Sequence, residues 1–508
     1  MRVLTTQKFK KSKLFIINSI IIMMSSLIIK VIASVFDIFL ANEIGAEAIG
    51  VYSLIMSIYM FAVTIATSGV NLAATKVISE EIEKGNNANI PRIVKRCFLY
   101  SFIMGCFACV LLILFTPYIC EHWLMNKISH IVLYSLAVSL PFVSLTSAIS
   151  GYFLAIRNVL RTSISQIAGQ LIRIGVVFIL VTKIFPSNIN NSALALVIGS
   201  TLSEILSFIF LYITYLKDRK KHSKLHCTEK TLTKRILKIS LPIAITSYIR
   251  SGLNTLKQII IPIRLKLNGM SYEKAIAEYG IICGMAMPII MFPSVIVYSY
   301  SSLLVPEFSR FSVHSDKKDM TNTISKMFKI TLYFSIAITG ILMCFGKDLG
   351  RLLYNTPDVG WYIKVMAPLI TLIYLDNVID SILKGLGKQV SVMCCNILDL
   401  VISVSFIYYL LPIFGNIGYI IVMYISEILN YSISVITLFK ETNLKFKYFE
   451  WVILPTICII AALILTGIFS FTYLSSTLSL VLKIFMCILF YVFLLQTHNF
   501  IQAKEALK

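Results

Sequence analysis

Long apolar stretches separated by short polar segments dominate this sequence. Each stretch is about as long as the ~20 mostly apolar residues that a helix needs to cross the hydrocarbon core of a bilayer. They lie near residues 14–40, 46–68, 93–116, 131–155, 162–184, 192–216, 239–264, 276–303, 327–346, 361–382, 389–411, 415–439, 449–470 and 476–497. The pattern predicts an all-α polytopic membrane protein with about fourteen transmembrane helices.

The composition is also that of a membrane protein. Of the 508 residues, 57% are hydrophobic and only 14% are charged, and the mean hydropathy is +0.85. Soluble domains carry about a quarter charged residues. The lipid bilayer is therefore the first expected partner of this chain.

The net charge of +22 would suit a nucleic-acid partner if the basic residues were clustered on one surface, but their placement follows the spans. With the N-terminus in the cytoplasm, 33 of the 46 Lys and Arg residues fall in cytoplasmic segments and only seven in outer loops. This bias is the positive-inside signature of membrane topology. It predicts a cytoplasmic (inner) membrane protein with both termini in the cytoplasm and no nucleic-acid partner.

The longest polar segment, residues 217–238, suggests how the chain is divided. We expect an N-terminal lobe over 1–216, a basic cytoplasmic linker over 217–238, the core of a C-terminal lobe over 239–439 and a helical hairpin over 440–508. The two halves echo each other weakly, as in transporters built from internal repeats around a central site. His222, His226 and Cys227 lie in the linker without a fourth metal ligand, so no metal site is expected.

The motifs of common enzymes are missing from the sequence. It contains no GxxxxGK[ST] phosphate loop, no HExxH and no GxSxG, and the predicted outer loops are short. We therefore expect neither an enzyme nor a bound cofactor. A transporter needs no covalent chemistry, only a polar path through the bilayer and two conformations.

Three basic residues in the seventh predicted span, Arg250, Lys257 and Arg264, recur every seven residues. A helix drifts by only ~20° per heptad, so at ~1.5 Å per residue they form a stripe about 21 Å long, with Asn254 beside it. Such a stripe suits an anionic head group, because Arg binds phosphate with two parallel hydrogen bonds. Alternatively, Arg250 and Arg264 reach opposite interfaces and only Lys257 lies deep.

Two further polar stripes lie in the first and fifth predicted spans. Lys30 and Asp37 are seven residues apart, and Gln166, Gln170 and Arg173 share one helix face. Charged groups at membrane depth are costly and are functional candidates by default. We predict that these residues face a substrate cavity; pairing with neighbouring helices is the structural alternative.

Acidic residues concentrate in other spans, at Glu204, Asp376, Asp380, Asp399 and Glu427. Asp376 and Asp380 are neighbours on one helix face. Two carboxylates this close favour binding of a proton or a cation, so Asp376, Asp380, Asp399 and Glu427 are candidates for coupling to Na⁺ or H⁺. Hydrogen bonding between helices is the alternative role.

Several motifs resemble one family of membrane proteins. The similar segments are 40–52 (LANEIGAEAIGVY), 261–265 (IPIRL), Tyr279-Gly280, 284–286, Phe292-Pro293, 304–306, 151–153 and the residues Ser165, Gln166, Gln170 and Arg173. In order and spacing they resemble the polysaccharide flippase family that includes stage V sporulation protein B and is related to lipid II flippases. The resemblance implies two helical bundles around a central cavity, alternating access, a polyprenyl-pyrophosphate-linked saccharide as substrate and a role in spore cortex synthesis.

The chain departs from the lipid II flippases in the first span, where Phe36 stands in place of their second arginine, and at Gly169, where relatives often carry an acid. The cations of the seventh span are candidates to supply the missing charge. We therefore predict a lipid-linked saccharide flippase. A cation-coupled multidrug exporter and a non-transporting scaffold for peptidoglycan-synthesis enzymes are the alternatives.

Overall fold

A computed structural model describes residues 2–86, 89–184, 189–219, 232–314, 317–442, 444, 446–469 and 475–505. The described elements are helices: α1 (Arg2–Thr67), α2 (Val70–Glu83), α3 (Ile90–Tyr118), α4 (His130–Ala155), α5 (Val159–Ile179), α6 (Ile189–Arg219), α7 (Leu232–Leu267), α8 (Tyr272–Tyr279), α9 (Met287–Met291), α10 (Ser294–His314), α11 (Lys317–Tyr354), α12 (Pro357–Met366), α13 (Leu369–Gly385), α14 (Gln389–Thr442), α15 (Leu454–Ile468) and α16 (Ser476–Glu505). Short π-helical turns extend some of them at Ile119–Trp123, Leu180–Ile184, Gly280–Ala286 and Phe449–Ile453. The predicted all-α fold is confirmed.

Every predicted span coincides with helical structure. Within the described ranges, ten helices are long and apolar enough to cross a membrane, or eleven if the bent pair α12–α13 is one span. Two of them contain two predicted spans each: α1 is broken at Gly45 and α14 at Gly415, where the backbone leaves helical geometry. The remaining predicted span is α7, whose basic residues lower its hydropathy.

The chain folds into two compact units. Unit 1 comprises Met1–Phe36, Glu47–Lys266 and Met270–Ala277, and unit 2 comprises Asp37–Ala46, Leu267–Gly269 and Glu278–Lys508. The units therefore differ from the expected lobes, because α7 lies in unit 1 and a piece of α1 lies in unit 2. A functional division at the linker stays a prediction, and residues 220–231, including His222, His226 and Cys227, lie outside the described part.

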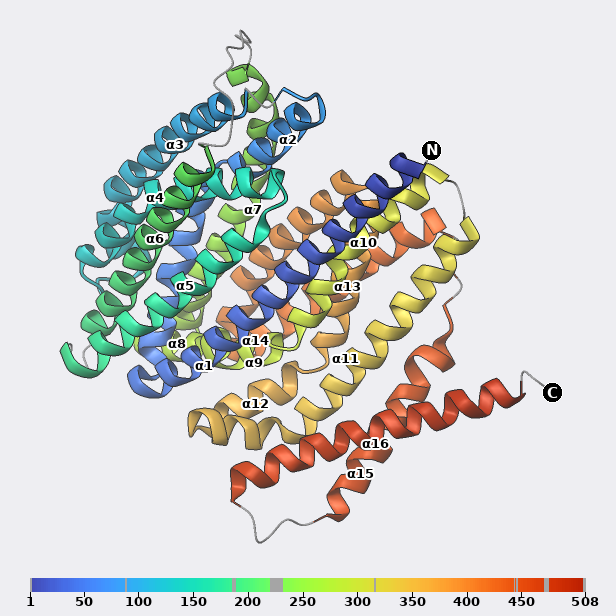
Figure 1. Cartoon of the computed structure of the whole chain (residues 1–508). Coiled ribbons are helices and arrows are strands. Elements are labelled where there is room, and N and C mark those ends of the chain that lie inside the picture. Colours follow the sequence, from blue (N-terminus) through green and yellow to red (C-terminus); the bar gives the residue numbers. More distant parts are fainter. Residues whose placement is uncertain are drawn as a thin grey trace. The chain divides into compact units, whose positions relative to one another are not determined.

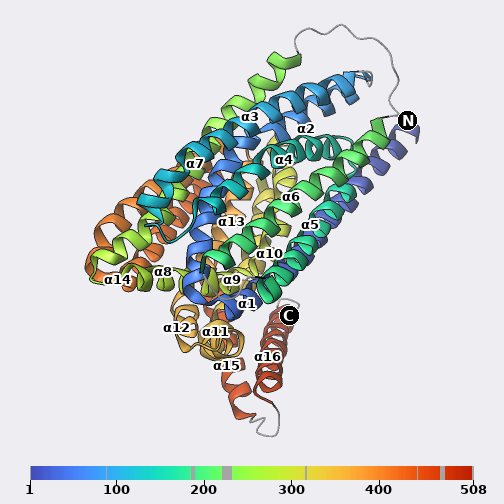
Figure 2. The same ribbon diagram turned by 90° about the vertical axis from the view of Figure 1, so that its left-hand side faces the viewer.

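Small residues let the helices of unit 1 approach closely. A Cβ at Gly151 of α4 would lie 2.6 Å from the carbonyl oxygen of Asn71, and one at Gly105 of α3 would lie 2.7 Å from the Cα of Pro141. Glycine at such crossings is typical of membrane helices. The core that results is formed by buried aliphatic and aromatic residues of α2, α3 and α4 with the ends of α6 and α7. Figure 2 shows α5 and α6 running side by side within this unit.

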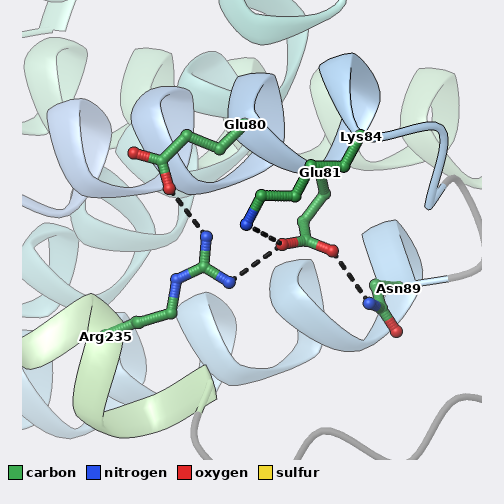
Figure 3. Close-up of polar contacts among 5 residues, drawn as sticks. All are labelled: Glu80, Glu81, Lys84, Asn89 and Arg235. Carbon is green, nitrogen blue, oxygen red and sulfur yellow. Dashed lines mark hydrogen bonds and ion pairs between the residues drawn. The ribbon is translucent and has the colours of Figure 1, made fainter.

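A buried ion network fastens the start of α7 to α2 (Figure 3). The Arg235 guanidinium donates to Glu80 at 2.7 Å and to Glu81 at 2.8 Å. Glu81 is only 1% exposed and also accepts from the Asn89 amide at 2.9 Å, while Lys84 lies 3.9 Å away. Because a buried carboxylate needs partners for its lone pairs, this network fixes the start of α7 to α2, at Arg235 within the expected linker 217–238.

A second ion pair ties the loop between α3 and α4 to its neighbours. The Lys127 ammonium donates to Glu273 of α8 at 2.5 Å and lies 3.6 Å from Glu47 of α1. The hydrogen bond to Glu273 raises the pKa of Lys127 above its ordinary value. These contacts attach the loop to α8 and α1.

In unit 2, too, glycines allow close helix contacts and hydrogen bonds connect the helices. Gly350 of α11 and Gly360 of α12 are so close that a Cβ at Gly350 would lie 2.5 Å from the Gly360 nitrogen. The last two helices, α15 and α16, form a hairpin (Figure 1). Tyr491 of α16 attaches this hairpin to α11 by donating to the carbonyl oxygen of Tyr333 at 2.8 Å.

Candidate substrate cavity and candidate ion site

Unit 1 contains a cavity of about 570 Å³ lined by α1, α4, α5 and α6. Most of its polar lining is hydroxyl and amide groups, with the charged residues Lys30, Arg173 and Glu204 among them. The polar lining residues are Ser26, Lys30, Tyr59, Thr146, Ser150, Thr162, Ser165, Gln166, Gln170, Arg173, Ser200, Ser203, Glu204 and Ser207. The structure thus brings together four of the residues that the sequence nominated for substrate binding: Lys30, Gln166, Gln170 and Arg173.

The helical period of α5 explains why its polar residues meet in this cavity. Gln166, Gln170 and Arg173 follow one another at spacings of four and three, which places them on one face. The helix lies tightly against α6 through Gly169, where a Cβ would come within 2.5 Å of the Ser207 hydroxyl. Ser203 donates to the Gly169 carbonyl at 2.7 Å. A side chain at position 169 would therefore require Ser207 to move.

The Arg173 side chain is fixed in the cavity by a hydrogen bond to Tyr52. One of its terminal nitrogens donates to the Tyr52 hydroxyl at 2.6 Å, and its Nε is buried without a partner in the described ranges. Among the described residues, neither Arg173 nor Lys30 forms an ion pair with a carboxylate. Glu204 lines the same cavity and interacts with Arg173 only over a longer distance. Two cations with open donors therefore face a space rich in neutral hydrogen-bonding groups.

Two neutral residues support this cavity without giving any signal in the sequence. Tyr52 holds Arg173, and Tyr59 is hydrogen-bonded to Ser139 at 2.7 Å while it lines the cavity. An uncharged tyrosine in an apolar span resembles any other aromatic residue there. Glu204 differs, because the sequence marks it as an intramembrane acid, and its position in the sixth span could have suggested a place beside Arg173.

The cation stripe of α7 does not line this cavity. Arg250 and Asn254 are exposed and Lys257 is half-buried, on one face of the helix. Other residues of α7 attach it to α1: the Thr255 hydroxyl donates to the Ser57 carbonyl at 3.0 Å. Arg264 lies in the last turn of α7.

Lys30 and Asp37, which the sequence predicts on one face of the first span, belong to different units. Lys30 lies in unit 1 and lines its cavity, whereas Asp37 begins the short segment of α1 that belongs to unit 2. Phe36, where the resemblance to the flippases leads us to expect an arginine, is buried at 4% exposure. Position 36 therefore contributes an apolar side chain to packing.

The four acids nominated for ion coupling lie on α13 and on both halves of α14, in unit 2. Asp376 and Asp380 are 9% and 8% exposed. Asp376 accepts from the Asn430 amide at 2.8 Å, and Asp380 accepts from Asn396 at 3.2 Å and from Lys384 at 3.3 Å. The sequence gives no hint of these partner amides, because a neutral amide in a span carries no charge signal.

Asp399 and Glu427 complete the set. Asp399 accepts a short hydrogen bond from Ser426, which in turn accepts from Ser403 at 2.8 Å. Glu427 lies on the same half of α14 as Ser426 and Asn430 and interacts electrostatically with Tyr298 of α10. Within the part of the chain that the structure describes, one oxygen each of Asp376, Asn377 and Asn430 is buried without a hydrogen-bond donor. Oxygen groups of this kind are what hard cations and protons bind.

Comparison with solved structures establishes the class of fold. The chain superposes on a lipid II flippase MurJ in an inward closed conformation with a TM-score of 0.73, at 14% identity, covering 97% of this chain and 100% of that one. It superposes on an inward-facing multidrug resistance MATE family transporter of the MOP superfamily with a TM-score of 0.65, at 13% identity, covering 83% and 99% of the two chains. The fold is that of the MurJ and MATE transporters.

Sequence comparison then gives the family. The profile described as "Polysaccharide biosynthesis protein" matches residues 15–312, and the MatE profile matches residues 266–409. The chain belongs to the polysaccharide biosynthesis protein family. It is 22% identical to stage V sporulation protein B of Bacillus subtilis (strain 168) over 461 residues, 89% of each chain, and 22% identical to the lipid II flippase MurJ of the same organism over 432 residues, 77% of each chain.

Proposed function

We propose that this chain is a flippase that carries a polyprenyl-pyrophosphate-linked saccharide, such as lipid II or a similar precursor, across the cytoplasmic membrane by alternating access. The observation that carries the proposal is the cavity of unit 1. Lys30 and Arg173 offer cationic donors that form no ion pair among the described residues, and hydroxyl and amide groups surround them. Cations suit the pyrophosphate and neutral hydrogen-bonding groups suit the sugars.

The similarity to stage V sporulation protein B and to MurJ supports the same substrate class and suggests a role in spore cortex or cell-envelope synthesis. In this proposal Gln166 and Gln170 bind the saccharide, and Arg250, Asn254, Lys257 and Arg264 form a second polar path along α7. Asp37 is proposed to contribute from unit 2. The polyprenyl tail stays in lipid, because transferring it through a polar cavity would expose a large apolar surface.

Coupling to an ion is the second part of the proposal. We assign binding of Na⁺ or H⁺ to the acids of unit 2, Asp376, Asp380, Asp399 and Glu427, because the carboxylates share a largely buried region with acceptor oxygens that have no donor among the described residues. Cation binding there would neutralise charge and favour one of the two conformations. The basic segments predict that both termini lie in the cytoplasm.

A second candidate function is export of cationic drugs coupled to an ion. Glu204 in the unit 1 cavity favours it, since an acid attracts a cationic drug, and the superposition on a MATE transporter agrees. Lys30 and Arg173 in the same cavity oppose it, because they would repel that cargo. A scaffold for peptidoglycan-synthesis enzymes remains the non-transporting alternative, which a chain inactive in every transport assay would favour.

The experiment is a comparison of cargoes in proteoliposomes. The purified chain is reconstituted with fluorescent lipid II, with a polyprenyl-monophosphate sugar of equal tail length, or with a fluorescent cationic drug. We expect lipid II to cross fastest, because two cations match a pyrophosphate better than a monophosphate. Faster movement of the drug would replace the flippase proposal by the exporter.

A further inference from the structure

A second polar cavity lies in unit 2, away from the acids assigned to ion binding. It has a volume of about 540 Å³ and opens between the C-terminal end of α11 and the N-terminal end of α16. Asp348, Arg351 and Asn355 line it from the first side, and Ser476, Ser479 and Lys483 from the second. The volume falls in the range of small-molecule sites, about 300–1,000 Å³.

The two cations that line this cavity come from different helices, Arg351 from α11 and Lys483 from α16. Among the described residues, neither the Arg351 guanidinium nor the Lys483 ammonium forms an ion pair with a carboxylate, although Asp348 lines the same cavity. The two positive groups share the cavity lining with one carboxylate, Asp348, so the lining carries a net positive charge. Arg and Lys together with serine hydroxyls are groups that bind phosphate.

The surroundings indicate that this anion belongs to a lipid. Along α16, exposed apolar residues such as Val481 and Phe485 directly follow the serines of the cavity. The cavity therefore lies where a polar end of the hairpin meets a face suited to acyl chains. Arg and Lys side chains near the ends of membrane helices extend to the interface, where lipid head groups lie.

We propose that this cavity binds the head group of a membrane phospholipid, with its phosphate on Arg351 and Lys483. Asp348 gives the cavity an acid, so an amine-bearing head group, as in phosphatidylethanolamine, fits better than a purely anionic one. Bound there, the lipid links α11 to the α15–α16 hairpin. The site is separate from the substrate cavity of unit 1 and does not depend on the identity of the cargo.

The test uses the purified, delipidated full chain in detergent, and native mass spectrometry measures retained phosphatidylethanolamine or phosphatidylglycerol during a titration. We expect Arg351→Gln/Lys483→Gln to weaken phosphatidylethanolamine binding by about tenfold or more, because it removes two charge-assisted contacts. Each single variant should give an intermediate loss, which keeps the test valid if the double variant folds poorly. Asp348→Asn should weaken binding of phosphatidylethanolamine but not of phosphatidylglycerol.

The matched control is Lys347→Gln, which removes a neighbouring exposed charge from α11 that does not line the cavity. It should leave lipid binding unchanged. Wild-type affinity in the single and double variants, or an equal loss in the control, would overturn the assignment. Displacement of the lipid by an equal concentration of inorganic phosphate would also overturn it, since the site would then recognise a free anion.

Discussion

Replacement of Arg173 by glutamine tests the substrate cavity most sharply. The guanidinium has five N–H donors, and among the described residues the structure pairs one of its terminal nitrogens with Tyr52 and leaves Nε buried without a partner. The remaining donors are available to a pyrophosphate. Arg173→Gln removes the positive charge and shortens the side chain, while the helix packing around Gly169 stays in place.

The expected loss follows from the contacts removed. A hydrogen bond to a charged group contributes about 1.5–3 kcal/mol, which corresponds to a decrease of roughly 10- to 150-fold in affinity. The substitution also removes the attraction between Glu204 and the Arg173 cation. Combining Arg173→Gln with Glu204→Gln separates the two effects: if phosphate binding is lost, the double variant should stay as defective as the single one.

The assay follows the flipping rate against lipid II concentration in proteoliposomes, so that a rise in KM can be distinguished from a lower maximal rate. Lys183→Gln is the matched control, because Lys183 is an exposed cation that continues the same helical segment and does not line the cavity. A change of less than about threefold in Arg173→Gln, well below the range expected from the lost contacts, would refute the assignment of Arg173 to phosphate binding if the variant unfolds like the wild type.

Three further outcomes are expected. Lys257→Ala should slow flipping by about tenfold or more without loss of folded protein, and an unchanged transport rate would remove the α7 stripe from the substrate path. Asp376→Asn should abolish the dependence of flipping on a Na⁺ or H⁺ gradient, while Asp358→Asn, an exposed acid at the start of α12, should retain it. Arg235→Gln should lower the free energy of unfolding by about 3 kcal/mol, as measured by equilibrium unfolding in detergent. This value lies near the lower end for a broken buried pair, because a quarter of the Arg235 side chain is exposed. A decrease below about 1 kcal/mol, as for a surface pair, would contradict it.

The helices were predictable from the sequence because apolar length alone determines what can cross a bilayer. The polar face of α5 was predictable for a similar reason: residues at spacings of three and four share a face wherever the helix packs. Its meeting with Lys30 in one cavity was expected but depends on how α1, α4, α5 and α6 are arranged around that cavity, which no local pattern specifies.

Other features depend on tertiary packing and could not be predicted. The backbone leaves helical geometry at Gly45, with φ of 80°, inside a segment of α1 that belongs to unit 2. The seven-residue spacing of Lys30 and Asp37 predicts that they share a helix face, but it cannot show that they belong to different units. Likewise, the amides of Asn396 and Asn430 resemble any other polar residue in a span until the fold places them against carboxylates.

The central claim is that the chain itself moves a lipid-linked saccharide. The most direct measurement is the appearance of fluorescent lipid II in the outer leaflet of proteoliposomes that contain the wild type, Lys30→Gln/Arg173→Gln or no protein. We predict rapid appearance with the wild type only, and rates near those of protein-free liposomes with the double variant. Equal rates in all three preparations, with the protein shown to be folded, would contradict the flippase proposal.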